Sequence, residues 1–485
     1  MTRIVARKEL AEAVRTPQFF VNVFVCLVLL PAAISINARD YQQRVAAFER
    51  YQTLAADTLN RRSVAANTPL DGYRPPSPFS PFFSGMEPLL PTRITVTPGG
   101  YSVSNNQWIS NPGAVLFGRV DLFFIVSVVL SLLAFVFASS AIANEQQTGE
   151  LRFTLAAPVS ARHLFAGKFL GNYIALVFPF IIGTLLTVPI LWTPYRTEFP
   201  AVLIYLGIFV SVALLFLFSL MALAFLVLSL VRRPMFALQA LLFTWLLLVY
   251  VIPKTSPIVA EIIQPSQSHE LLSLQSERLQ RELETEFKKQ SRVLLDSVLA
   301  ANNMGNCLLT LLASPDASPR QRQVLANYWA QAKPLKQQFD ARWQSQIASL
   351  ESTYAHAANQ QQALTVALSR LSPVGCLTNI AAALSHNGRQ EIETIEQSAR
   401  AFQSEAERML YSRYTRQSFG DLAEIVVIDT NAAGARGPVQ FPTMAYHRPA
   451  ITAGFFAQWP DLLVLTLLSA LCFRVSLSRF ARRVA

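Results

Sequence analysis

The sequence predicts an all-α polytopic membrane protein with six transmembrane helices, an N-terminal interfacial helix, and a mainly helical extracytoplasmic domain with a small β element. Two observations predict this class. Apolar residues make up 52% of the 485 residues, whereas charged residues make up only 15%. The apolar residues gather in six runs that are long enough, or nearly so, to cross a hydrocarbon core of about 30 Å, and long polar segments separate some of these runs.

Hydropathy and charge divide the chain into parts. We predict an interfacial helix at 1–18, a basic tail at 476–485, and a hinge at 143–168 between the second and third spans. The extracytoplasmic segments are 37–119 and 253–458. The predicted spans are 19–36, 120–142, 169–191, 201–231, 235–252 and 459–475.

The segment before the first span has helical character. Ala6, Leu10 and Ala13 fall on one side of such a helix, with Lys8 and Glu12 opposite. A helix of this kind lies in the membrane interface. The alternative is a secretory signal peptide, since basic residues precede the first apolar run. The length and acidic residues of the leading segment favour the interfacial helix.

Basic residues in the short connections predict the orientation. They gather before the first span, between the second and third, between the fourth and fifth, and after the sixth, whereas the loop after the third carries only Arg196, offset by Glu198. Because short cytoplasmic loops retain Lys and Arg, we expect both termini in the cytoplasm of a multi-pass protein of the cell (inner) membrane. The net charge of +11 reflects these clusters, so we expect no nucleic-acid partner.

The extracytoplasmic segments predict a small sheet and long helices. Alternation on both sides of Pro98-Gly99-Gly100 predicts a hairpin, and residues 424–429 could supply a third strand. Three apolar stripes at helical spacing predict helices between 253 and 420. The stripes are Leu272, Leu279, Leu283, Phe287, Leu294 and Val298; Leu335, Phe339, Trp343, Ile347, Leu350 and Tyr354; and Ile392, Ile395, Phe402, Met409 and Tyr414.

Two cysteines, Cys307 and Cys376, fall in the predicted extracytoplasmic domain. An oxidising compartment permits a disulfide between them, close to two helix junctions. Two separately buried thiols are the alternative, because sequence does not establish the geometry that a bridge needs.

The sequence carries no catalytic or metal-binding motif. The five histidines are not at metal-ligand spacing, and Gly167-Lys168 is followed by Phe169 where a phosphate loop needs Ser or Thr. We therefore expect no metal site, no bound cofactor and no enzyme activity in this chain. The span interiors carry no ionisable side chain of the kind that ion-coupled transporters use, so the energy for any transport has to come from a partner.

The hinge between the second and third spans is short, basic and amphipathic. Thr148 can cap a brief helix that Pro158 ends, and Ser160 can cap the helix that follows. The apolar side of the brief helix could bind in a partner's groove or lie in the lipid interface.

Three motifs in and after this hinge, together with the order of the spans, resemble the ABC-2 type permeases, the membrane subunits of ATP-binding-cassette exporters. The motifs are Glu145, Gly149 and Leu151; Pro158, Val159 and Ser160; and Gly167, Lys168, Leu170 and Gly171. The long insert between the last two spans is similar to a subfamily with a large extracytoplasmic domain.

The resemblance implies a coupling helix in the hinge and a separate cytoplasmic ABC ATPase, present as a dimer, that binds ATP and Mg. It also implies a second copy of this chain, or a homologous permease, beside it in the membrane lipid. The implied coupling interface is Glu145, Gly149, Glu150, Leu151, Arg152, Phe153, Leu155 and Pro158. The alternative function is a non-transport device in which the ATPase drives the extracytoplasmic domain against a periplasmic or cell-wall partner.

Overall fold

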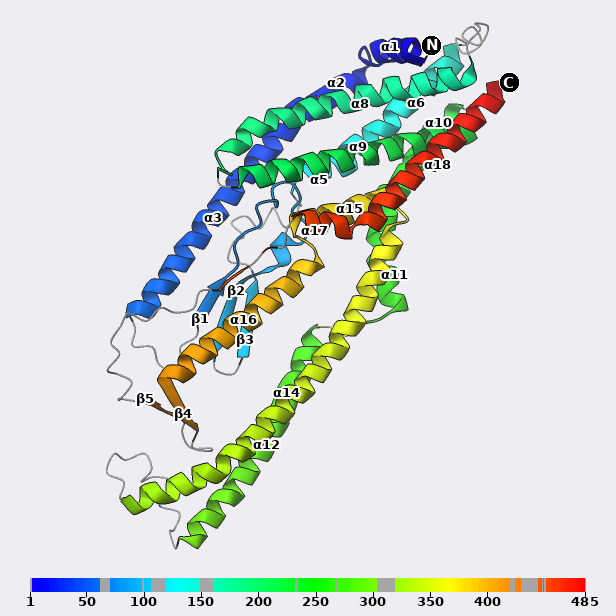
Figure 1. Ribbon diagram of the computed structural model, residues 1–485. Helices are drawn as coiled ribbons and strands as arrows, with labels where there is room; N and C mark the ends of the chain where they lie inside the picture. Colours follow the sequence, from blue (N-terminus) through cyan, green and yellow to red (C-terminus); the bar gives the residue numbers. More distant parts are fainter. Residues whose placement is uncertain are drawn as a thin grey trace. The chain divides into compact units, whose positions relative to one another are not determined.

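The computed structural model forms two compact units (Figure 1). The membrane unit comprises residues 1–256, 366–407 and 439–485, and the hairpin unit comprises 257–365 and 408–438. The structure describes residues 2–61, 70–97, 100–105, 119–148, 160–196, 198–231, 234–266, 269–302, 319–418, 424–428, 444–446, 448 and 451–484.

Among the described residues, six helical segments are long and apolar enough to cross a membrane, and each overlaps one of the predicted runs. The predicted all-α polytopic class is therefore confirmed. In chain order the segments are formed by α2 (Pro17–Phe24), η1 (Val25–Leu29) and α3 (Leu30–Arg61); α5 (Leu122–Phe124), η3 (Ile125–Leu130) and α6 (Ser131–Thr148); α8 (Ala161–Trp192); α9 (Phe199–Leu230); α10 (Pro234–Leu246), η4 (Leu247–Val251) and α11 (Ile252–Ile263); and α18 (Trp459–Val484).

The helix α9 is central to the membrane unit, where it packs against α6, α8 and α18. An aromatic cluster fills the junction of α8, α9 and α18. The rings of Phe169 and Phe473 are 5.0 Å apart, and those of Phe165 and Phe225 are 5.5 Å apart, both edge to face. Such pairs stabilise a fold beyond the area they bury, by about 0.5–1.5 kcal/mol each, so this junction contributes to the stability of the core.

A short apolar helix, α15 (Pro373–Ser385), also packs into this core. Ser372 caps it by accepting from the Val374 amide at 3.1 Å, and His386 ends it in the left-handed conformation at φ 52°. The Ser372 hydroxyl also donates to the Leu248 carbonyl of η4. Since a π turn shifts the hydrogen-bond ladder of its helix, a neighbouring donor stabilises this carbonyl.

An ion pair joins the approach to α15 with the start of α18. The fully buried Asp461 accepts from Arg370 at 2.9 and 3.2 Å and from Asn379 at 2.9 Å. Cys376 is buried beside them, with its Sγ 3.7 Å from the Arg370 carbonyl, and burial raises the pKa of its thiol to about 12. Cys307 lies outside the described residues, so the bridge between the two cysteines stays a prediction.

The predicted hairpin is confirmed in an antiparallel sheet of order β1-β2-β3, in which Ile94 pairs with Val103 and Val96 with Tyr101. The predicted third strand is wrong. Residues 424–428 pair with β4 in a separate sheet, and β1 takes the third place, where Leu70 pairs with Val96 and both side chains are buried. The strands are β1 (Leu70–Tyr73), β2 (Pro91–Thr97), β3 (Gly100–Asn105), β4 (Tyr414–Ser418) and β5 (Glu424–Ile428).

The third apolar stripe lies in α16 (Arg389–Arg413), where Ile395 and Phe402 are buried. Its predicted last member, Tyr414, is instead the first residue of β4. Helical spacing alone does not show where a helix ends, because the same residue types suit a strand.

The hairpin unit is built from α12 (His269–Ala301) and the first part of α14 (Pro319–Ser369). The predicted stripes of the two helices face each other, and the rings of Phe287 and Phe339 are 5.6 Å apart. Val298 and Leu299, near the C-terminal end of α12, pack with Tyr328 of α14.

Candidate functional site

The hinge has two described flanks. The helix α6 ends at Thr148 and α8 begins at Ala161, with Ser160 at its N-cap position. Glu145 lies in the last turn of α6. The other predicted coupling residues lie between the two helices and outside the described residues. They are Gly149, Glu150, Leu151, Arg152, Phe153, Leu155 and Pro158. Their role stays a prediction, and the flanks show how the hinge is attached.

The helix α8 begins directly after Ser160, as expected, but the Ser160 side chain does not cap it. Residues 161–168, assigned to the hinge, are the first two turns of α8, and Leu164 and Phe165 within them are buried. The Ser160 hydroxyl contacts His163 Nδ1 and does not bond a backbone amide. The helix therefore reaches closer to the hinge than hydropathy indicates, because packing stabilises turns that are not apolar throughout.

Two glycines let α1 (Thr2–Ala13) pack directly on this part of α8 (Figure 1). A Cβ at Gly167 would lie 2.6 Å from the Val5 side chain, and one at Gly171 would lie 2.8 Å from the Ala6 carbonyl oxygen. Both distances are too short for any side chain, and glycines four residues apart are a common device for close helix contact. This contact accounts for the two glycines of the third motif.

The lysine of the same motif forms a buried ion pair. Lys168 Nζ lies 2.7 Å from Glu9 Oε1 of α1, and the two side chains are 2% and 7% exposed. Removal of one partner of such a pair leaves a buried charge and costs about 3–5 kcal/mol. Lys8 and Glu12, on the opposite side of α1, are 54% exposed each, as the predicted amphipathicity requires. We call the packing of Gly167, Lys168 and Gly171 on α1 the α1–α8 contact.

The first span continues this packing along α8. Pro179 has no amide to donate to the Ala175 carbonyl, and the Asn22 amide of α2 donates there at 3.2 Å and to Leu176 at 2.9 Å. One turn further, a Cβ at Gly183 would lie 2.0 Å from the Cys26 carbonyl oxygen. Asn22 is therefore an interhelical contact, and the first and third spans are held together over several turns.

At the other end of the first span, α3 enters a buried ionic network. Arg44 lies 3.0 Å from Asp40 and 3.5 Å from Glu87, and Arg74 lies 3.3 Å from Glu87 and 3.8 Å from Glu391 of α16. Burial alone would raise the pKa of Glu87, but Arg74 and Arg44 hold it below its ordinary value. The network thus ties the first span to the polar segment that carries the sheet.

Sequence reasoning did not find the partner of Lys168. The available signal was Glu9, which lies on the apolar side of α1 next to Leu10, together with Gly167 and Gly171 on either side of Lys168 at the edge of the third span. The pairing joins residues 159 positions apart. Among the described residues, no group of three or more His, Cys, Asp or Glu side chains could hold a metal ion.

A family model described as ABC-2 family transporter protein matches residues 3–483. No curated protein matches the sequence. The match covers both flanks of the hinge, the α1–α8 contact, the six candidate spans and the long insert between the last two of them. The chain is therefore a permease that belongs to the ABC-2 transporter family.

Proposed function

We propose that this chain is the permease subunit of an ABC exporter, driven by a separate ATP-binding subunit that docks on residues 149–158. Membership of the ABC-2 family supports the class. The observation that carries the mechanism is the α1–α8 contact, which fixes the start of α8, and with it one end of the hinge, to the N-terminal helix and the first span.

The described contacts offer a continuous route for movement. Displacement of the hinge acts on α8, which packs on α1 at Gly167 and Gly171 and on the first span at Gly183. The first span runs without a break into α3, where Arg44 pairs with Glu87. A push at the hinge is therefore passed along rigid elements to the ionic network and the three-stranded sheet.

In this proposal ATP and Mg are bound by the dimeric partner ATPase, and the chain itself holds neither. A second copy, or a homologous permease, completes the pathway in the membrane lipid. The protein lies in the inner membrane with both termini in the cytoplasm, where α1 lies at the interface and exposes Lys8 and Glu12 to water.

The orientation is tested by labelling single cysteines in intact cells. Ser160→Cys and Arg482→Cys are expected to be shielded from a membrane-impermeant maleimide, and Asn359→Cys is expected to react, because the basic connections fall on one side. The side chains of Ser160 and Asn359 are both exposed in the structure. A cysteine at either position that fails to react is therefore shielded by the membrane. Labelling at Ser160 with protection at Asn359 would show the opposite orientation.

The function is tested by reconstituting the permease and its ATPase in liposomes. Transport is expected to need ATP, and ATP turnover is expected to rise with a transported solute. The other candidate function, a device that acts on a periplasmic or cell-wall partner, predicts that turnover rises with that partner and that nothing crosses the bilayer. The second result would contradict the exporter proposal.

A further inference from the structure

The chain between β1 and β2 reaches the core of the membrane unit beside α5 (Figure 1). Four prolines between residues 75 and 81 exclude a regular helix, and the chain folds into turns instead. Phe79 and Phe82 are buried among the apolar side chains of the spans, and Phe82 is fully enclosed. We call residues 77–84 the plug segment.

Phe79 and Phe82 cover the ends of neighbouring spans. Phe79 stacks on Tyr205 of α9 with 4.7 Å between ring centroids, and Phe82 lies 5.4 Å from the same ring. Phe82 also lies 6.4 Å from the ring of Tyr195, which follows the last turn of α8. Its carbonyl accepts from the Phe123 amide of α5 at 3.0 Å. The plug segment therefore packs at the C-terminal end of α8 and near the N-terminal ends of α5 and α9, which is one end of three consecutive spans.

The two tyrosine rings in this contact carry buried hydroxyl groups. Tyr195 and Tyr205 are 2% and 0% exposed, and within the described ranges neither hydroxyl has a hydrogen-bond partner. A buried hydroxyl without a partner costs free energy, and nearly all such groups in proteins bond other protein groups or ordered water. Two of them under one segment indicate a site that receives polar partners in another arrangement of that segment.

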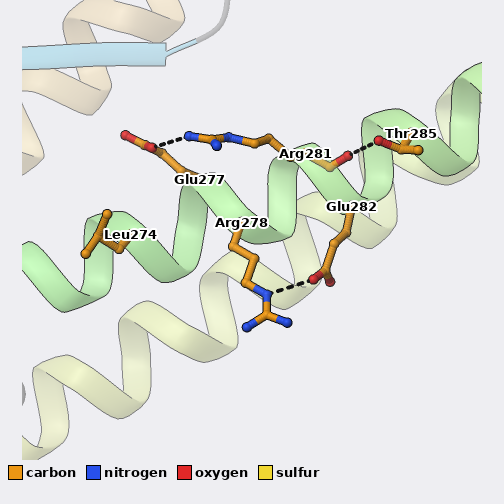
Figure 2. Close-up of a pocket in the computed structure, with 6 residues that line it drawn as sticks. All are labelled: Leu274, Glu277, Arg278, Arg281, Glu282 and Thr285. Carbon is orange, nitrogen blue, oxygen red and sulfur yellow. Dashed lines mark hydrogen bonds and ion pairs between the residues drawn. The ribbon is translucent and has the colours of Figure 1, made fainter.

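The helix α12 shows how exposed polar side chains of this protein are satisfied. In Figure 2, Glu277 pairs with Arg281 and Arg278 with Glu282, both at 2.9 Å. The Thr285 hydroxyl donates to the Arg281 carbonyl at 2.7 Å. These side chains have a neighbour in the helix and also face water. The hydroxyls of Tyr195 and Tyr205 have neither, so water can stabilise them only if the plug segment moves.

Hydrogen bonds at its edges hold the plug segment in place. Arg44 of α3 donates to the Ser80 hydroxyl at 2.8 Å, and the Ser77 hydroxyl donates to the Ser385 carbonyl at the end of α15 at 2.9 Å. Directly after the segment, Gly85 takes φ 44°, which gives the chain a left-handed turn. Such hydrogen bonds exchange for bonds to water at small net cost. Because Arg44 also belongs to the ionic network of the first span, movement of that span would act on the plug segment.

We propose that the plug segment closes the extracytoplasmic end of the export path, and that its withdrawal exposes the hydroxyls of Tyr195 and Tyr205 to a polar solute. The two hydroxyls then donate to and accept from hydrogen-bonding groups of the solute. This inference rests on the proposed function, because the ATPase supplies the movement that reaches Arg44 through the first span.

Maleimide labelling of the permease–ATPase complex in lipid nanodiscs tests the movement, since ATP and the reagent reach both faces there. In a Cys307→Ser background the other three cysteines are buried. Tyr205→Cys and, as a second reporter, Tyr195→Cys are expected to react at least about tenfold faster with ATP and Mg than without, because enclosed thiols are inert and exposed ones react. The matched control is Met221→Cys, a fully buried position further along α9, which is expected to stay unreactive in both conditions. An equal rise at Met221 would overturn the proposal.

A disulfide lock shows whether the plug segment is the part that moves. Ser77→Cys and Ser385→Cys replace two side chains whose residues are already joined by a hydrogen bond, so a bridge there needs little rearrangement. Oxidation is expected to abolish the effect of ATP on Tyr205→Cys, and reduction is expected to restore it. The same ATP effect in the locked protein, or no effect in a complex that hydrolyses ATP, would overturn the plug and leave the exporter proposal standing. A permease that does not bind the ATPase would overturn both.

Discussion

Replacing Leu151 with Glu, or Phe153 with Asp, is expected to separate the permease from its ATPase while the spans stay inserted. A buried apolar contact at the centre of an interface contributes about 2 kcal/mol or more, so binding of the ATPase should weaken at least about 30-fold. ATP turnover should no longer respond to ligand. The measurements are co-purification of the ATPase and its stimulated hydrolysis in liposomes.

The conservative variants Leu151→Met and Phe153→Leu provide the control, because they keep an apolar side chain at the same position. They should bind the ATPase within a few-fold of the unchanged chain. Full assembly and stimulated hydrolysis in Leu151→Glu and Phe153→Asp would contradict the coupling role. A helix that lies only in the lipid interface predicts that result, since it has no protein contact to lose.

Replacing Lys168 with Met is expected to destabilise the α1–α8 contact by about 3–5 kcal/mol, because it breaks the buried ion pair and removes the cation that lies 2.7 Å from Glu9. Detergent-purified protein should melt several degrees lower, and ligand should stimulate ATP turnover less. The double variant Glu9→Leu with Lys168→Leu should recover most of the melting temperature, since apolar side chains of similar size replace a buried ion pair at little cost.

The exposed pair on the other side of α1 is the matched control. Lys8 and Glu12 are 3.3 Å apart and both half-exposed, so Lys8→Met should change stability by less than about 1 kcal/mol. The same melting curve for Lys168→Met and Lys8→Met would show that the buried pair does not hold α1 to α8.

The class and the spans were predictable because each depends on a continuous stretch of residues. Hydrophobic length finds a span, and Pro98-Gly99-Gly100 determines a hairpin between neighbouring strands. The third strand was assigned wrongly because its pairing depends on contacts far along the chain. Residues 424–428 suit a strand anywhere, and the pairing of the buried Leu70 with Val96 is what places β1 beside β2.

The candidate site likewise has parts that the sequence predicts and parts that it does not. The start of α8 directly after Ser160 could be predicted from the sequence, whereas Thr148 is the last residue of α6 and Pro158 lies outside the described residues. The partners of Lys168 and Asn22 could not be predicted from the sequence, because each hydrogen bond joins positions more than 150 residues apart. The need for these polar side chains arises from a buried charge and from the missing amide of Pro179.

The central claim is that residues 149–158 contact a cytoplasmic ATPase directly. A photo-activated cross-linker placed at Leu151 in the assembled complex tests it with the hinge otherwise unchanged. The account predicts a covalent product with the ATP-binding subunit, which should disappear in a Phe153→Asp background. Cross-links to lipid with none to that subunit would contradict it.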